Sequence, residues 1–146
     1  MGNIIPARRF LGENQQGLLK PIIYCGPPEE ITNRAVSLNR ELALALSKYK
    51  PNRRTMQIER CFLSAIEKLP EDSIIKEFDV LFHPDYKIDI LRLMIGVCKS
   101  KQFSMIWPGS FDGDHLIYAE EGYADYKIFS VSDYDITCVV WGGREQ

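Results

Sequence analysis

The chain has 146 residues, of which 45% are hydrophobic and 26% are charged, with a formal net charge of −2. These proportions are typical of one soluble globular domain and exclude an intrinsically disordered or fibrous protein. The balance of charge provides no overall positive field that would hold nucleic acid or an anionic membrane. No segment reaches the roughly 18 apolar residues of a membrane span, and no secretory signal opens the chain. We therefore expect a cytoplasmic protein with no membrane partner.

The four cysteines lie far apart, at Cys25, Cys61, Cys98 and Cys138. They form no C-x-x-C pair, and no clustered histidines complete a zinc site, so we expect no bound metal. Most of them stand in apolar runs, which predicts buried free thiols in a reducing compartment.

The first residues, 1–19, show no stable hydrophobic period, and we expect a flexible N-terminal arm there. A single domain then covers residues 20–146. Its first element is a short apolar strand over residues 21–25, which ends at Gly26-Pro27-Pro28. Such a continuous apolar run is typical of a buried parallel strand.

Helical spacing of apolar residues marks three later segments. Asn39 is the expected N-cap of a helix over residues 40–48. A second helix spans residues 53–69 and ends at Pro70. A third spans residues 88–101, where the apolar side chains share one face.

Short apolar runs predict further strands, with a helical turn over residues 31–34 between the first two. These strands cover residues 35–38, 73–82, 103–107, 115–119 and 136–141. Helices and strands alternate, and the strands are apolar throughout. The sequence therefore predicts an α/β domain with a mainly parallel sheet of about five strands flanked by helices.

The loop after the first strand is the expected ligand site, because parallel sheets bind ligands at the carboxyl ends of their strands. A working phosphate loop has the pattern G-x-x-x-x-G-K-[ST], whose amides, lysine and hydroxyl hold the phosphates and magnesium. Gly26 matches its start, but Ile31, Thr32 and Asn33 replace its last three positions. The pattern is a degenerate Walker A motif, or simply a rigid turn between a strand and a helix.

The same loop carries two carboxylates, Glu29 and Glu30, which would repel a polyphosphate. If a nucleotide binds at all, the residues that would contact it are Gly26, Pro27, Pro28, Thr32, Asn33 and Arg34.

The partner motif of a phosphate loop is an acidic residue that ends a hydrophobic strand and holds magnesium. Its best counterpart here is Lys76, which cannot coordinate a metal, while Glu77 and Asp79 are Walker B-like residues nearby. Neither His83 nor His115 has a serine or cysteine in a triad arrangement, so we assign no catalytic residue.

Several segments together resemble the small P-loop proteins of type 3 BREX phage-defence systems, the BrxF family. The similar segments are IIYCGPP at residues 22–28, DVLFHPDYKIDILRL at 79–93, WPG at 107–109 and HLIYAE at 115–120. The resemblance covers roughly residues 20 to 140. It implies a three-layer P-loop-NTPase-like fold and a role in a multi-protein defence assembly on bacterial DNA.

Two surfaces are candidate interfaces. Trp107-Pro108-Gly109 ends a strand at the ligand-binding edge, where an exposed indole would anchor a partner, although it could equally belong to the core. A tract of tyrosines interleaved with carboxylates, which suits a basic protein partner, contains Tyr118, Tyr123 and Tyr126.

Three hypotheses for function follow. The first is a non-catalytic adaptor or regulatory subunit, a pseudo-NTPase without cofactor, that docks onto larger subunits of a bacterial anti-phage defence complex and associates with DNA at most indirectly. The second is an NTPase that binds Mg-ATP at a rebuilt site, with Arg34 on the phosphates and Glu77 or Asp79 on the metal. The third is a small DNA-contacting module acting through Arg8, Arg9, Arg53 and Arg54. The sequence leaves the oligomeric state open.

Overall fold

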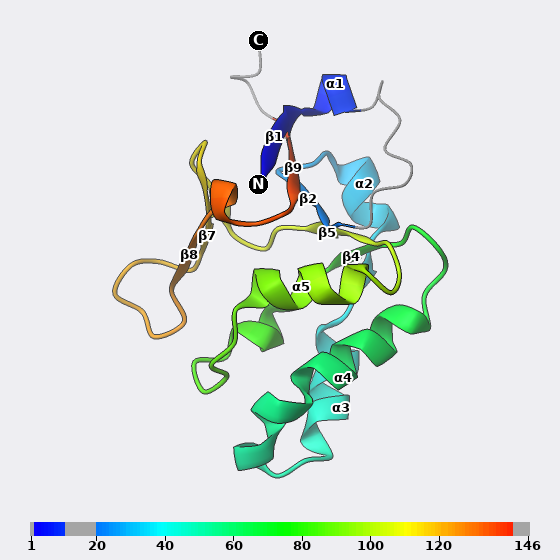
Figure 1. Ribbon diagram of the computed structural model, residues 1–146, viewed down its shortest axis with the longest axis vertical. Coiled ribbons are helices and arrows are strands. Elements are labelled where there is room, and N and C mark those ends of the chain that lie inside the picture. Colours follow the sequence, from blue (N-terminus) through cyan, green and yellow to red (C-terminus); the bar gives the residue numbers. More distant parts are fainter. Residues whose placement is uncertain (1, 11–19, 142–146) are drawn as a thin grey trace.

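The computed structural model describes residues 2–10 and 20–141 (Figure 1). The strands are β1 (Asn3–Pro6), β2 (Ile22–Cys25), β3 (Val36–Ser37), β4 (Ile74–Lys76), β5 (Ser104–Ile106), β6 (Ser110–Phe111), β7 (His115–Tyr118), β8 (Lys127–Ser130) and β9 (Thr137–Val140). The α-helices are α1 (Ala7–Phe10), α2 (Glu29–Arg34), α3 (Asn39–Ser47), α4 (Arg54–Glu67) and α5 (Ile90–Cys98). Short 3-10 helices are η1 (Pro51–Arg53), η2 (Asp79–Phe82) and η3 (Val131–Asp133).

Six strands form one sheet in the order β1-β9-β2-β5-β4-β3, and all of its strand pairs are parallel. A second, antiparallel sheet has the order β6-β7-β8. The predicted α/β class with a mainly parallel sheet flanked by helices is confirmed. The parallel sheet has six strands rather than about five, because the N-terminal segment contributes β1.

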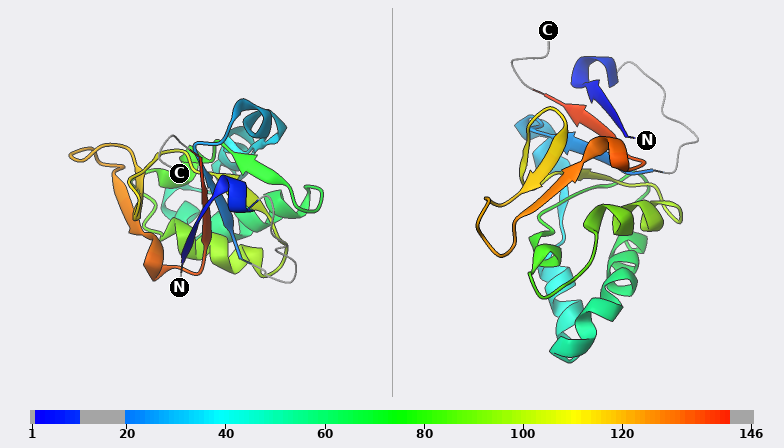
Figure 2. Two further views of the ribbon diagram at one scale, coloured as in Figure 1. Left: turned by 90° about the horizontal axis from the view of Figure 1, so that it is seen from above. Right: turned by 60° about the vertical axis from the view of Figure 1, so that its left-hand side comes forward.

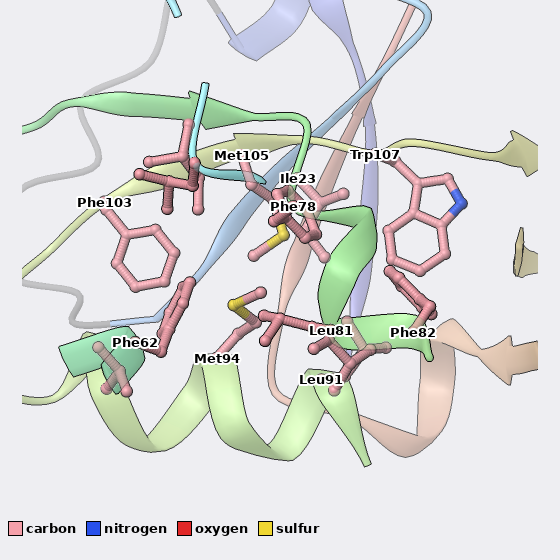
Figure 3. Packing of buried hydrophobic residues seen from close by; sticks show 14 of the residues in the cluster. Ile23, Phe62, Phe78, Leu81, Phe82, Leu91, Met94, Phe103, Met105 and Trp107 are labelled. Atoms are coloured by element: carbon pink, nitrogen blue, oxygen red, sulfur yellow. The ribbon is translucent and has the colours of Figure 1, made fainter. Parts of the chain in front are cut away.

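The core lies between the parallel sheet and helix α5, which runs across one face of it (Figures 1 and 3). Met94 of α5 points toward Ile23 and Met105 of the central strands, whereas Phe62 of α4 lies against Phe103, with ring centroids 5.7 Å apart (Figure 3). All five side chains are buried. Ile23 and Met105 face this core, whereas their neighbours Ile22 and Ile106 are only partly buried. The four cysteines are buried free thiols, as predicted.

The N-terminal segment differs from the predicted arm. Residues 3–6 form the edge strand β1, which pairs with β9 from Asn3 opposite Thr137 to Pro6 opposite Val140. Proline is compatible with an edge strand because one side of that strand has no ladder partner. Residues 11–19 of the expected arm lie outside the described residues.

The strand predicted over residues 73–82 is wrong beyond Lys76. Glu77 has a φ of 53°, a left-handed conformation that ends the strand, and η2 follows. Phe78 and Leu81 are nevertheless buried. The apolar run therefore predicted correctly that these residues are buried, but it could not distinguish a strand from a buried 3-10 turn.

Helix starts also differ from expectation. Asn39 is the first residue of α3 rather than its N-cap, and no side chain caps that helix. Asp89 instead caps α5, where its Oδ1 accepts hydrogen bonds from the backbone amides of Leu91 (3.1 Å) and Arg92 (3.2 Å). An aspartate directly before an apolar helical run is a recognised N-cap signal, so the sequence held the information that defines this start.

Within the part of the chain that the structure describes, no helix has both the length and the apolar character needed to cross a lipid bilayer.

Candidate functional site

The carboxyl ends of three adjacent strands, β2, β5 and β9, meet at a shallow cavity of about 220 Å³. The connection that leaves β2 leads toward β3 on one side, whereas the connection that leaves β5 crosses to β9 on the other. Such a reversal is a topological switch point, where open α/β sheets bind their ligands. The cavity is smaller than the roughly 300–1,000 Å³ of most small-molecule sites. Its lining residues are Cys25, Gly26, Trp107, Gly109, Ser110, Phe111, Val140 and Trp141.

The turn that follows β2, where the sequence shows either a degenerate Walker A pattern or a rigid turn, lies at this edge and is short. Gly26 follows β2 with a φ of 66°, a conformation that favours glycine. After Pro27 and Pro28, helix α2 already begins at Glu29. Only three residues therefore separate the strand from the helix, and they leave no wide loop in which phosphates could sit.

The residues at the positions of the second glycine and the lysine lie inside α2 rather than at its start. The amides of Ile31 and Thr32 both donate to the carbonyl oxygen of Pro28, at 3.1 and 3.2 Å, and the Thr32 hydroxyl donates to the same oxygen at 3.4 Å. In a working phosphate loop such amides and hydroxyls would donate to phosphate oxygens, whereas here they donate to the backbone at the start of α2. Asn33 and both carboxylates of the first turn are exposed.

Lys76, at the expected position of the metal-binding carboxylate, has a structural role. Its Nζ donates a hydrogen bond to the backbone oxygen of Thr32 at 3.0 Å, which joins the end of β4 to the last turn of α2. A cation near the carbonyl groups at the C-terminal end of a helix is favourable. The ammonium group thus fixes α2 in place, in a contact that sequence reasoning did not find.

The two Walker B-like residues are not brought together as a pair. Glu77 is exposed, whereas the Asp79 carboxylate accepts hydrogen bonds from the Tyr118 hydroxyl (3.0 Å) and from Nδ2 of Asn39 (3.5 Å). Asn39 also accepts a bond from the amide of Val80 at 2.8 Å. Asp79 therefore joins α3, η2 and β7 as a structural link. Burial, followed by the bond to Asp79, raises the pKa of Tyr118.

Arg34, the proposed phosphate ligand of a rebuilt site, is exposed in the last turn of α2. Burial raises the pKa of the Tyr24 phenol, and a hydrogen bond with Ser104 and the positive charge of Arg34 partly offset that increase. Arg34 therefore stands in the last turn of α2, and its charge reaches the Tyr24 side chain of β2.

Trp107 is a core residue, so the hypothesis of an exposed anchor is wrong for this side chain. It is 5% exposed, and its Nε1 donates to the carbonyl oxygen of Ile117 at 3.0 Å. Its ring meets Phe82 edge to face, with ring centroids 5.8 Å apart (Figure 3). It meets Phe129 in the same way, with centroids 5.9 Å apart. The indole therefore joins the parallel sheet to the antiparallel one.

Gly109 also contributes to this contact between the two sheets. A Cβ atom at this position would overlap the same Ile117 carbonyl group, so only glycine lets the chain pass β7 this closely. The Trp-Pro-Gly motif is thus explained by the packing of the two sheets. Pro108, between Trp107 and Gly109 in the sequence, is partly buried.

The tyrosine tract divides into buried and exposed members. Tyr118 is half-buried and stacks on Phe82, with ring centroids 3.8 Å apart and planes at 8°. Tyr126 is partly buried as well, whereas Tyr123 is 65% exposed. Of the three tyrosines, Tyr123 alone presents most of its ring to solvent.

The four arginines proposed to contact DNA are not gathered on one surface. Arg8 and Arg9 belong to α1, whereas Arg53 and Arg54 lie where α4 begins, at the other end of the long axis (Figures 1 and 2). The Nε of Arg54 also donates to the backbone oxygen of Tyr49 at 3.0 Å.

In the described part of the chain, no three His, Cys, Asp or Glu side chains are grouped as a metal site requires. When the chain is compared with protein-family models, characterised proteins and solved structures, none of them matches it. The class that its own structure defines is an α/β protein with a parallel six-stranded sheet.

Proposed function

We propose that this protein is a non-catalytic, P-loop-like adaptor or regulatory subunit of a bacterial anti-phage defence complex. The observation that carries the proposal is the early start of α2, three residues after β2. This start places the positions of the glycine, lysine and hydroxyl of a phosphate loop inside the helix. Mg-ATP does not fit the residues at this edge.

The P-loop-like part of the proposal is supported by position. A glycine turn follows a central strand at the switch point of a parallel sheet, where α/β proteins bind phosphate groups. The role in phage defence is supported by the resemblance of four segments to the BrxF family. On this proposal the domain keeps a glycine turn where related folds bind nucleotide, but the turn is too short to hold phosphate groups.

The alternative hypotheses are less well supported. A rebuilt NTPase site would need Arg34 and Asp79 at the cavity beside Gly26. Neither residue lines that cavity, and the Asp79 carboxylate is bonded to Tyr118. A DNA-binding module would need its arginines on one surface.

Isothermal titration with Mg-ATP and with Mg-GTP tests the proposal. We expect no saturable binding at nucleotide concentrations up to roughly 1 mM. A Kd of about 1 mM corresponds to a binding free energy of about −4 kcal/mol. The double variant Glu29→Gln/Glu30→Gln is the matched control, because it removes the repulsive charges and leaves the turn unchanged. It should also fail to bind, since the turn lacks the space for phosphates. Micromolar binding that is lost on substitution of Gly26 would overturn the proposal.

Affinity purification from cells that carry the surrounding genes tests the adaptor role. We expect the tagged protein to be recovered with larger subunits of the defence system, at a fixed ratio that nucleotide does not change. Recovery of the protein alone under conditions in which the other subunits are expressed would contradict this role.

A further inference from the structure

A groove of about 620 Å³ lies between α3 and α4, away from the switch point. Among its lining residues Cys61 and Ala65 are buried and form the floor, whereas four basic side chains and Glu41 also line it. Its lining residues are Ser37, Arg40, Glu41, Leu44, Ala45, Lys48, Tyr49, Arg60, Cys61, Ser64, Ala65 and Lys68. Leu44, one of these lining residues, is 58% exposed and adds an apolar side chain to the groove.

The groove concentrates positive charge in a chain whose formal net charge is −2. Lys68 pairs with Glu41 at 3.3 Å. Arg40, Lys48 and Arg60 are exposed, and no described residue forms an ion pair with any of them. Three cations therefore line the groove without an ion-pair partner among the described residues.

The charges of two of these residues reach the floor of the groove. Burial raises the pKa of the Cys61 thiol, and the positive charges of Arg60 and Lys48 act against that increase. The groove thus offers a carboxylate-rich ligand both apolar contact and positive charge at short range.

A second surface has the opposite character. The loop between β7 and β8, residues 119–126, carries Glu120, Glu121 and Asp125 around the exposed ring of Tyr123. Two turns hold it, because the amide of Tyr123 donates to the oxygen of Glu120 and the amide of Tyr126 donates to the oxygen of Tyr123, each at 3.1 Å. A loop that is already ordered loses little entropy on binding.

The loop is separated from the groove of its own chain. In Figures 1 and 2 it projects sideways from the body, whereas the α3–α4 pair extends from one end. A contact between these two surfaces therefore requires two molecules.

We infer that the 119–126 loop of one copy docks into the α3–α4 groove of a second copy. The three carboxylates of the loop match the three unpaired cations of the groove in number and sign. Tyr123 would supply the aromatic anchor that interfaces favour, against the apolar floor. DNA would satisfy the cations but would leave that floor uncovered. The inference goes beyond the proposed function and does not depend on whether nucleotide binds.

The contact joins two different surfaces, so each bound copy still presents one free groove or one free loop. Assemblies of this kind grow head to tail into rings or open chains. Because exposed ion pairs contribute to it, the association should weaken as salt shortens the range of the charges.

Sedimentation velocity at increasing protein concentration tests the inference. We expect species larger than dimers at about 50 mM salt, and monomers at about 1 M salt, where the Debye length falls to about 3 Å. The groove variant Arg40→Glu/Arg60→Glu and the loop variant Glu120→Lys/Glu121→Lys should each be monomeric at low salt. All four residues are exposed, and circular dichroism is used to check that the variants fold.

Mixing the two variants gives the decisive result. The groove variant keeps an intact loop and the loop variant keeps an intact groove, so the mixture should form 1:1 heterodimers that grow no further. A matched control, Lys87→Glu/Glu71→Lys, changes exposed charges away from both surfaces and should associate like the unmodified protein. A monomeric unmodified protein, a mixture that stays monomeric, or association that survives either variant would overturn the inference. The milder variant Arg40→Gln/Arg60→Gln replaces the groove variant if charge reversal prevents folding.

Discussion

Replacing Trp107 by alanine is expected to lower the free energy of unfolding by about 3–5 kcal/mol, the range measured for large aromatic residues in protein cores. The indole is almost fully buried between Phe82 and Phe129, and it donates a hydrogen bond to the Ile117 oxygen. Its loss would leave a cavity between the two sheets and remove one partner of that oxygen. Equilibrium unfolding in urea measures the effect.

The variant Trp107→Phe separates the two contributions. It keeps an aromatic ring in the joint but removes the N–H donor, so we expect a cost of about 1–3 kcal/mol. If Trp107→Ala cost less than about 1 kcal/mol while weakening recovery of a protein partner, the side chain would be a surface anchor after all.

Replacing Gly109 by alanine is expected to destabilise the protein by about 3 kcal/mol, at the upper end of the range for overpacked sites. The added methyl group would overlap the Ile117 carbonyl, which belongs to the backbone of β7 and cannot rotate away as a side chain could. The strand pair β6–β7 would have to shift, because Ser110 pairs with Ile117.

The matched control is Gly96→Ala in the interior of α5. A Cβ there meets no atom within 4 Å, and alanine favours a helix over glycine by about 0.5–1 kcal/mol. We therefore expect this variant to be slightly more stable than the unmodified protein. Thermal and urea unfolding of both variants check the pair, and equal effects at Gly109 and Gly96 would contradict the packing argument.

The architecture could be predicted from the sequence where apolar runs matched whole elements. The predicted strands over residues 21–25 and 103–107 contain the central strands β2 and β5, because short apolar runs are typical of strands in a parallel sheet. The same signal failed over residues 77–82, where buried residues form a 3-10 turn. It also missed β1, whose residues are partly exposed and are held by pairing with β9.

The candidate site was predictable in position but not in shape. The order of elements places Gly26 at the carboxyl edge of the sheet, as the sequence predicts. The early start of α2 could not be foreseen, because the pattern of the loop fixes residue types but not where helical hydrogen bonds begin. Contacts such as Lys76 with Thr32 and Tyr118 with Asp79 join residues about 40 positions apart, and no local pattern reports them.

The place of β9 in the sheet has a consequence for how the protein is made. This strand, the last in the described chain, lies between β1 and β2, so that Cys138 is opposite both Ile4 and Ile23. During synthesis β1 cannot pair with β9 until the chain has been made as far as Val140, long after β1 itself. Closing a pairing between residues as far apart in the sequence as Asn3 and Thr137 is slow, so the flank of β2 that β9 covers stays open to chaperones until late in folding.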